Sequence, residues 1–515
     1  MTRRGTAGCL LAAAGALSLH PSASPAWAAR PTLGTPKLRC EMSAFSASPA
    51  VTITAARPVG GSAPHCRVEG FTTTTNPGPN TVGFIVALPE AWSGRYLMII
   101  PGGSASTAAD PPAEYVAAGY AVATTDRGTH VKESLDFSFQ ADPARSADFT
   151  YRAAHVSAVA TQALAAAFYA RPQRYRYITG CSTGGAGTLM SAQWFPEDAE
   201  AFIPAAVDPD GGAPSFWGYI GQQLARDPQR WISEAETKRI AETIMARFDA
   251  EDGARDGLIW DPTRIVLTPG LFPYLSPKQF AMLKLLGDGF PNAEGRAQGY
   301  WLSNPVPLGR VLWGTGPAPW TAATRPMMLM VSDTTARARY GADYDLVRDM
   351  DFTRPQPKWR PKASPKPGDL GPGNFGLLRR TGGKVLMYIG NADQNVAPLN
   401  HLDFTDEVTR LYGPSRANWL RNFMVPGMYH CSGGEGTPTD VPEAMLRAAQ
   451  DWVELGKAPD YVVAANPALG RTYKLCSYPA VARFKGGPAN PRKLDVKDAA
   501  NWACTGTMRN PAGGR

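Results

Sequence analysis

The sequence predicts an α/β protein whose mostly parallel sheet is interrupted by a large insertion. Short β-prone runs alternate with helical spacing of apolar residues, as in YAVATTDRG at 120–128 and HVSAVATQALAAAFYA at 155–170. Strands that alternate with helices pair in parallel, with helices on both faces of the sheet. Between Gly211 and about Gly382 this alternation gives way to prolines, tryptophans and short mixed helices. We therefore expect a core in two parts, 29–210 and 383–515, and an inserted lid domain at 211–382.

Residues 1–28 have the pattern of a secretory signal peptide. Arg3 and Arg4 precede a short apolar stretch, which ends in small residues at Ala26-Trp27-Ala28. This stretch is too short to cross a membrane, and no other stretch approaches the roughly 20 apolar residues that a membrane span needs. We expect an exported protein, secreted or periplasmic, with no membrane span.

The charge and the cysteines support this expectation. The formal net charge of +8 falls to +6 without Arg3 and Arg4, and it is not gathered into a basic block, which argues against a nucleic-acid partner. Seven cysteines include Cys9 in the signal peptide, so six remain in an oxidising compartment. Three disulfides are expected, and the count alone leaves their pairing open.

The stretch YRYITGCSTGGAGTL at 175–189 carries the strongest signal for chemistry. A β-prone run leads to Ser182, which lies between Gly180 and Gly184 as G-x-S-x-G, and a helix of small residues follows. In such a nucleophile elbow the glycines allow a sharp turn that exposes the serine hydroxyl above the sheet. Ordinary strand-to-helix turns can contain the same motif.

Two later segments supply partners for this serine. Asp393 follows the strand-like run VLMYI in a glycine turn, and His430 lies in MVPGMYHCSGG. The order Ser182, Asp393, His430 is that of the α/β-hydrolases. His430 would take the serine proton during attack on an acyl carbon, and Asp393 would orient and stabilise the imidazole. A bridge between Cys181 and Cys431 would bring the histidine next to the serine.

Other residues are alternatives for these roles. Asp208 and Asp210 end the strand-like run AFIPAAV, and either could be the acid. His401, on a predicted helix, competes with His430 as the base. We expect His155 to cap or pack on the helix at 155–170.

The segment after RYLMII is the candidate oxyanion turn. Pro101-Gly102-Gly103 follows this buried run, and glycines there can present N–H groups to an oxyanion. We expect Gly103 N–H as one donor and Thr183 N–H as the other. A plain tight turn would have the same sequence.

The insertion contains two notable groups of residues. DAEDGARDGL places Asp249, Asp252 and Asp256 close together, and such carboxylates suit calcium, although an acidic solvated turn is the alternative. The spacing is not that of an EF-hand. The tryptophans suit flat aromatic ligands or a helical core equally well; they are Trp217, Trp231, Trp260, Trp301, Trp313 and Trp320.

Together, GCSTGG, the run G-x-A-D-Q-x-V-x-P and the His-Cys pair resemble the tannase/feruloyl esterase family over most of the chain after the signal. The resemblance implies an α/β-hydrolase fold. It also implies three disulfides, Cys181–Cys431, Cys40–Cys66 and Cys476–Cys504. For the lid it implies a structural Ca²⁺, held by the side chains of Asp249, Asp252 and Asp256 and by the carbonyls of Ala254 and Leu258.

These observations predict a secreted serine esterase for esters of aromatic acids, such as feruloyl or galloyl esters, either small or linked to polysaccharide. One alternative is hydrolysis of aromatic diacid monoesters of the terephthalate type, which the family also contains. Another is a non-catalytic protein that binds phenolic polysaccharide, which hydrolysis of a generic aryl ester would exclude. The sequence leaves the oligomeric state open.

Overall fold

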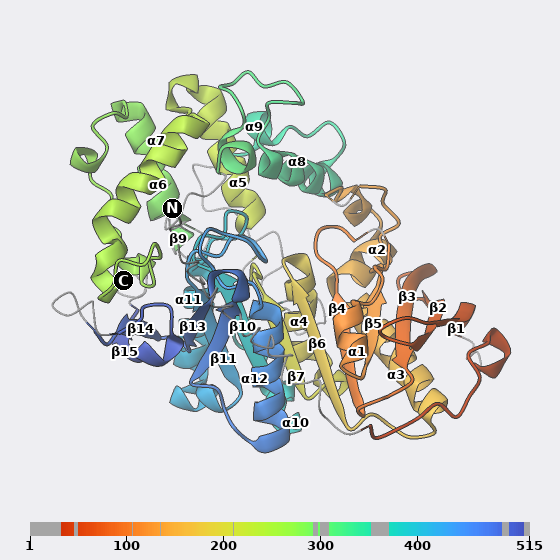
Figure 1. Cartoon of the computed structure of the whole chain (residues 1–515). Coiled ribbons are helices and arrows are strands. Elements are labelled where there is room, and N and C mark those ends of the chain that lie inside the picture. The colour runs from red at the N-terminus through yellow and green to blue at the C-terminus, as the bar shows by residue number, and fades with distance from the viewer. Residues whose placement is uncertain are drawn as a thin grey trace, which may run out of the picture.

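A computed structural model describes residues 32–45, 50–105, 107–133, 135–209, 211–291, 297–298, 308–351, 370–486 and 494–508. The predicted signal peptide, Asp210 and Trp301 lie outside these residues. Figure 1 shows a central sheet with helices on both sides, and a group of helices above it in this view.

One sheet of nine strands has the order β1-β2-β3-β5-β4-β6-β7-β10-β11. Neighbours from β5 to β11 run parallel, whereas β1, β2, β3 and β5 pair antiparallel in that order. The prediction of a mostly parallel sheet is confirmed. The strands are β1 (Val51–Val59), β2 (His65–Thr74), β3 (Asn80–Pro89), β4 (Arg95–Ile100), β5 (Tyr120–Thr125), β6 (Tyr175–Cys181), β7 (Ala201–Ala205), β10 (Lys384–Gly390) and β11 (Leu420–Val425).

Helices cover both faces of the parallel part of the sheet. β5 is buried throughout, as expected for a parallel strand with helices on each side. Because side chains alternate along a strand, Leu97 and Met98 of β4 belong to different apolar clusters. One cluster includes α12 (Val441–Leu455), and the other includes α3 (Ala153–Tyr169) and α4 (Thr183–Trp194). Further helices of the core are α1 (Ala113–Ala117), α2 (Pro143–Ala147), α10 (Gly376–Thr381) and α11 (Leu399–Tyr412).

Between β7 and β10 the chain leaves the sheet. It forms α5 (Ala213–Arg226), α6 (Glu234–Phe248), α7 (Pro277–Asp288), α8 (Met327–Tyr340), α9 (Leu346–Asp349) and the pair β8 (Phe290–Pro291) and β9 (Ala297–Gln298). These helices, green to teal in Figure 1, lie above the sheet. Their apolar cluster includes the buried Trp313 and extends to Phe137 and Ala392 of the core. Trp260 differs, because it stacks on Trp502 near the C-terminus.

Three disulfides connect distant parts of the chain. They join Cys40 to Cys66, Cys181 to Cys431 and Cys476 to Cys504, with Cα atoms 5.5, 5.8 and 5.7 Å apart. These are the pairs that the family resemblance implied. The last bridge ties β13 (Arg471–Cys476), which pairs with β12 (Tyr461–Asn466), to β15 (Trp502–Thr507), which pairs with β14 (Ala480–Phe484).

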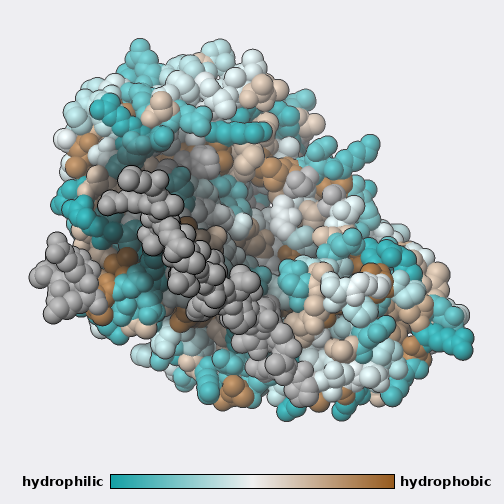
Figure 2. Space-filling model, in the orientation of Figure 1, coloured by the Kyte–Doolittle hydropathy of each residue, from teal (hydrophilic) through white to brown (hydrophobic). Residues whose placement is uncertain are grey.

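Figure 2 shows how hydropathy is distributed over one face of the molecule. On the face drawn in Figure 2, hydrophilic and neutral colours dominate, and hydrophobic residues are scattered. Across the described part of the chain, every helix is too short or too polar to cross a bilayer.

Candidate active site

Ser182 occupies the sharp turn between β6 and α4. Its backbone has φ 62° and ψ −125°, a conformation that costs energy in a residue with a side chain and that is concentrated at functional sites. The glycines two residues before and two residues after Ser182 have no room for a side chain. A Cβ at Gly180 would lie 2.6 Å from the backbone of Gly184, and one at Gly184 would lie 2.2 Å from the carbonyl oxygen of Ile100. The glycines therefore allow α4 to begin directly against the sheet.

Asp393 and His430 meet above the ends of β10 and β11. His430 Nδ1 lies 2.8 and 3.0 Å from the two carboxylate oxygens of Asp393. This carboxylate is 2% exposed and also accepts the N–H groups of Asn395 and Val396, both at 2.8 Å. A carboxylate only accepts hydrogen bonds, so Nδ1 carries the proton and Nε2 is the basic nitrogen.

The Cys181–Cys431 disulfide brings this pair to the serine. Ser182 directly follows one half-cystine, and His430 directly precedes the other. The histidine loop is fixed further by Gln394, whose side-chain oxygen accepts the His430 N–H at 3.1 Å. The structure thus joins His430 to Asp393 by hydrogen bonds and to the serine turn by a covalent bridge.

The alternative base, His401, is a buried structural residue. Its Nε2 lies 2.9 Å from the Val207 carbonyl oxygen, and its Nδ1 lies 3.4 Å from Asn422 Oδ1. Burial lowers the pKa of His401 to about 4, so it stays neutral in the core. The alternative acid, Asp208, instead accepts the Ala213 N–H at 2.9 Å, where α5 begins.

His155 packs as expected for a structural residue. Its Nδ1 lies 2.9 Å from Asp198 Oδ2, and its ring stacks on Phe195 at 4.1 Å between centroids. Burial alone would lower the pKa of His155, but the hydrogen bond and the charge of Asp198 outweigh it and raise the pKa. Burial of Asp198 raises the pKa of its carboxyl in turn.

The turn at 101–103 lies against the serine. A Cβ on Gly102 would be 3.5 Å from Ser182 Cβ and 3.0 Å from the carbonyl oxygen of Cys181. Thr183 begins α4, and the first N–H groups of a helix point out of it without an intrahelical acceptor. The Thr183 hydroxyl donates a hydrogen bond to the Gly103 carbonyl. The two residues predicted to bind the oxyanion are therefore neighbours beside Ser182.

A cavity of about 370 Å³ opens at Ser182 between the core and the insertion. Its volume is near the lower end of the range for small-molecule sites. Aromatic and aliphatic walls come from Phe137, Phe149, Met190, Trp217, Val331 and Val396. Polar and charged groups line the remainder, among them Arg127, Gln140, Thr150, Asp208, Thr335 and Arg339.

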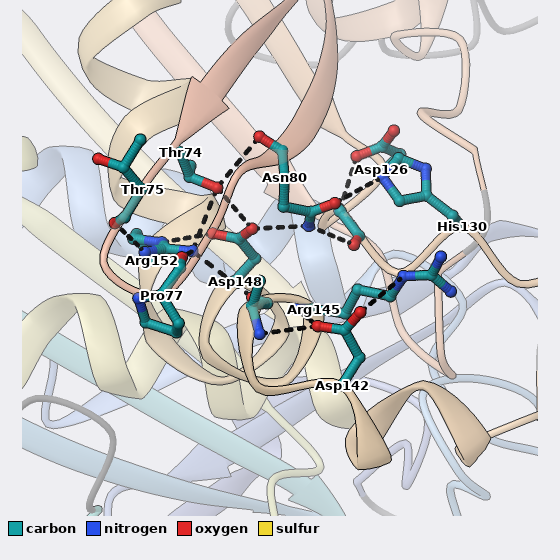
Figure 3. A network of polar contacts seen from close by, with 12 residues as sticks. Thr74, Thr75, Pro77, Asn80, Asp126, His130, Asp142, Arg145, Asp148 and Arg152 are labelled. Atoms are coloured by element: carbon teal, nitrogen blue, oxygen red, sulfur yellow. Dashed lines mark hydrogen bonds and ion pairs between the residues drawn. The ribbon is translucent and has the colours of Figure 1, made fainter.

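One wall of this cavity, residues 137–150, is anchored by a buried ion pair. The Asp148 carboxylate accepts hydrogen bonds from Thr74 Oγ1 at 2.8 Å, Asn80 Nδ2 at 2.7 Å and Arg152 Nε at 2.5 Å. Arg152 also donates to the carbonyl oxygen of Thr75 at 2.6 Å. Figure 3 shows Asp148 and Arg152 reaching from η3 (Asp148–Arg152) to the turn between β2 and β3. This network ties the cavity wall to the sheet.

The aspartate run of the insertion folds back on itself at η6 (Asp249–Asp252). Asp249 Oδ1 accepts the N–H of Asp256 at 3.2 Å, and the Asp256 carboxylate forms an ion pair with Arg471. Burial, followed by the charges of Asp256 and Asp249, raises the pKa of Asp252 to about 8. Burial also raises the pKa values of Asp249 and Asp256.

This donor set has the chemistry that calcium requires. The run contains three carboxylates, of which that of Asp256 pairs with the Arg471 guanidinium, and carboxylate oxygens are hard ligands of the kind that calcium takes. Among the described residues, however, no cluster of three or more His, Cys, Asp or Glu side chains is arranged to hold a metal ion. Calcium binding stays a prediction.

Most residues that line the cavity were not predicted from the sequence, nor were two residues that hydrogen-bond to predicted site residues, Arg127 and Gln394. Arg127 lies two residues after the end of the buried strand β5, and a charge in that position, in TTDRG, could have drawn attention to it. Gln394 adjoins the acid and is the glutamine of the run G-x-A-D-Q-x-V-x-P, which pointed to the family but not to a role for this residue.

The sheet order, the strained serine after β6 and the Asp–His pair after β10 and β11 define the chain as an α/β-hydrolase. Residues 66–273 and 373–504 match the tannase and feruloyl esterase family, and the chain belongs to this family. It is therefore a carboxylic ester hydrolase, and the predicted family membership is confirmed.

Similar proteins agree with this placement. The mono(2-hydroxyethyl) terephthalate hydrolase of Piscinibacter sakaiensis is 26% identical over 547 aligned residues, 89% of this chain and 87% of that protein. Feruloyl esterase B of Aspergillus niger is 26% identical over 459 residues, 81% of this chain and 82% of that protein. The crystal structure of feruloyl esterase B from Aspergillus oryzae shares the fold, with a TM-score of 0.76 at 21% identity, covering 90% of this chain and 99% of that one.

Proposed function

We propose that the protein is an exported serine esterase that cleaves esters of aromatic acids, with Ser182 as nucleophile, His430 as base and Asp393 as the orienting acid. The observation that carries this proposal is the His430–Asp393 hydrogen-bonded pair, held by a disulfide next to a strained serine. The three disulfides suit an oxidising compartment, in line with the predicted signal peptide.

The proposed reaction has two half-reactions. His430 Nε2 accepts the Ser182 proton as Oγ attacks the ester carbonyl carbon, and the resulting oxyanion accepts hydrogen bonds from the N–H groups of Thr183 and Gly103. The intermediate collapses as His430 protonates the leaving alcohol, which gives an acyl-enzyme. Water, deprotonated by the same nitrogen, then releases the aromatic acid and restores Ser182.

The cavity supports an aromatic acyl group. Phe137, Phe149 and Trp217 line a space that reaches Ser182, and flat aromatic groups gain from packing against such rings. The feruloyl and terephthalate esters on which the named relatives act are both aromatic. Feruloyl or galloyl esters are our first choice, free or linked to polysaccharide. Terephthalate monoesters are the second, because Arg339 in the cavity wall could face their free carboxylate.

A substrate panel tests the proposal. Purified protein is assayed with methyl ferulate, methyl gallate, mono(2-hydroxyethyl) terephthalate and methyl acetate, with Ser182→Ala as the background control. We expect at least one aromatic ester to exceed methyl acetate by about 100-fold in kcat/KM, since burial of an aromatic ring contributes about 3 kcal/mol. Equal rates on acetate and on all three aromatic esters would rule out aromatic specificity.

For the insertion, we propose that Asp249, Asp252 and Asp256, with the carbonyls of Ala254 and Leu258, hold a structural calcium ion. Bound calcium would neutralise the crowded carboxylates and would take no part in ester cleavage. Chelator should lower the melting temperature of the protein, and calcium should restore it. The Asp252→Asn variant should respond less. If neither chelator nor calcium changes the melting temperature, residues 249–258 form an acidic turn that is neutralised by protons and Arg471.

A further inference from the structure

We infer that Arg127 is a positioning residue for the oxyanion hole, acting through the Thr183 hydroxyl and the Pro101 carbonyl. The inference rests on the proposed serine-esterase function and adds a residue to it. Arg127 follows β5 and is 3% exposed. Its backbone adopts φ 62°, a conformation that residues with side chains keep only where their surroundings hold them in place.

The guanidinium of Arg127 connects three segments around Ser182. Nη1 donates to Thr183 Oγ1 at 2.9 Å and to the Pro101 carbonyl oxygen at 3.3 Å. Nη2 donates to the Phe149 carbonyl oxygen at 2.6 Å. Arg127 thereby joins the turn after β4, the first residue of α4 and the cavity wall, and one rigid planar group sets their spacing.

Thr183 passes this constraint on to Gly103. A hydroxyl has a single proton, so a hydroxyl that accepts from Arg127 directs its own hydrogen at the Gly103 carbonyl. The peptide unit that carries Gly103 N–H lies between two units whose carbonyls are both fixed, at Pro101 and at Gly103. The orientation of this N–H therefore depends on the hydrogen bonds from Arg127 and Thr183.

The same guanidinium also serves the acyl side of the cavity. Its central carbon lies 3.7 Å from the centre of the Phe149 ring, which fixes the plane of the group. Phe149 lines the cavity, so the acyl wall and the oxyanion turn share one support. A buried positive charge near the developing oxyanion also favours the transition state over the neutral ester.

The test uses the Thr183 hydroxyl, because its removal leaves both backbone donors and Arg127 in place. The Thr183→Val variant keeps the shape and loses the hydrogen bonds, and Thr183→Ser is the matched control that keeps the hydroxyl. Arg127→Lys is the third variant, since an ammonium group lacks the planar fork. The readouts are kcat/KM for methyl ferulate, the inhibition constant of phenylboronic acid, which adds to the active serine as a tetrahedral anion, and the binding of ferulate.

We expect Thr183→Val and Arg127→Lys to lower kcat/KM by about 10- to 100-fold, less than the loss of an oxyanion donor itself. The inhibition constant of phenylboronic acid should rise by a similar factor, and ferulate binding should change by less than about threefold. Thr183→Ser, which keeps the hydroxyl, should lose less kcat/KM than Thr183→Val. Wild-type kcat/KM in folded Thr183→Val, or a loss of rate with unchanged boronate binding, would overturn the inference. A wild type with no esterase activity, or an active Ser182→Ala, would instead overturn the proposed function.

Discussion

In the proposed mechanism, Ser182 depends on His430, because a serine is a poor nucleophile until a base removes its proton. We expect Ser182→Ala and His430→Ala each to lower kcat by about 10⁴- to 10⁶-fold, with little change in melting temperature. His65→Gln, in β2 and outside the site, is the matched control for loss of an imidazole. A His430→Ala protein that keeps most of its turnover would show that another group acts as the base.

His155 gives the protein a predicted pH dependence of stability. Asp198 raises the pKa of His155 above its value in the unfolded chain, so the folded state binds the proton more tightly. This contribution is fully present below about pH 6.5 and is lost as the pH rises through the raised pKa. His155→Gln should therefore lower the melting temperature more at pH 5.5 than at pH 9. Equal losses at both values would mean that His155 contributes only by packing on Phe195.

At this scale the sequence identified the residues that carry local motifs. G-x-S-x-G marked Ser182, and the strand-turn pattern marked Asp393. Arg127 and Gln394 were missed because each acts by a hydrogen bond to a segment that is distant in the chain. Arg127 bonds to Thr183, and Gln394 bonds to His430. The sequence could not separate His401 from His430 either, because the argument against His401 is its complete burial in the folded chain.

At the scale of elements, we expect η3 both to support the cavity wall and to stabilise the folded protein. Asp148→Asn would leave Arg152 beside a neutral amide. Breaking a fully buried ion pair costs about 3–5 kcal/mol, and this is the upper bound here because the Arg152 side chain is 12% exposed. We expect a loss up to this bound in urea unfolding, together with a higher KM, because the cavity wall at 137–150 loses its anchor to the sheet. The change should also weaken the contacts to Thr74 and Asn80 drawn in Figure 3.

Asp142→Asn is the control for this prediction. Asp142 also appears in Figure 3, but it is an N-cap at the surface, accepting the N–H groups of Ala144 and Arg145. Asparagine caps helices about as well, so the change should cost less than about 1 kcal/mol. If the two substitutions lower the free energy of unfolding equally, the Asp148 network contributes no more to stability than a surface helix cap.

The alternation of strands and helices was sufficient to predict a mostly parallel sheet. It was not sufficient to predict which strands are neighbours in that sheet. β3 and β4 follow each other in sequence, yet β5 lies between them. The antiparallel part of the sheet, β1 to β3, could not be ordered from periodicity, because alternation fixes a strand's faces and not its neighbours.

For the whole molecule, we expect the Cys181–Cys431 bridge to contribute both to stability and to catalysis. The bridge spans 250 residues, for which the chain-entropy estimate is about 5 kcal/mol. It also fixes the serine turn relative to the histidine loop, where a shift of about 1 Å can cost about 100-fold in rate. Cys181→Ala with Cys431→Ala should lose turnover at temperatures at which circular dichroism shows a folded protein.

The bridge Cys40–Cys66 provides the control, since it spans 26 residues far from the serine turn. Its removal should lower stability and leave kcat unchanged in the folded protein. A folded Cys181/Cys431 double variant with wild-type turnover would reduce that bridge to a purely stabilising role.

The insertion could be predicted from the sequence only in part. The break in alternation predicted an inserted lid domain at 211–382. In the structure, the elements between β7 and β10 lie outside the nine-stranded sheet, and the role of a lid stays a prediction. The roles of the tryptophans in the insertion could not be predicted from the sequence, because these residues have different surroundings. Trp217 lines the cavity, Trp313 is buried in the helical core and Trp260 packs near the C-terminus. Periodicity does not distinguish an aromatic ring that packs from one that binds.

Covalent trapping of the acyl-enzyme tests the central claim most directly. Wild-type protein is mixed with p-nitrophenyl ferulate, quenched in acid within the first turnover, and its peptides are mapped by mass spectrometry. The account predicts a feruloyl group on the peptide that contains Ser182 and none on that peptide in Ser182→Ala. Hydrolysis by the wild type without any adduct at Ser182, or with the acyl group on another residue, would contradict it.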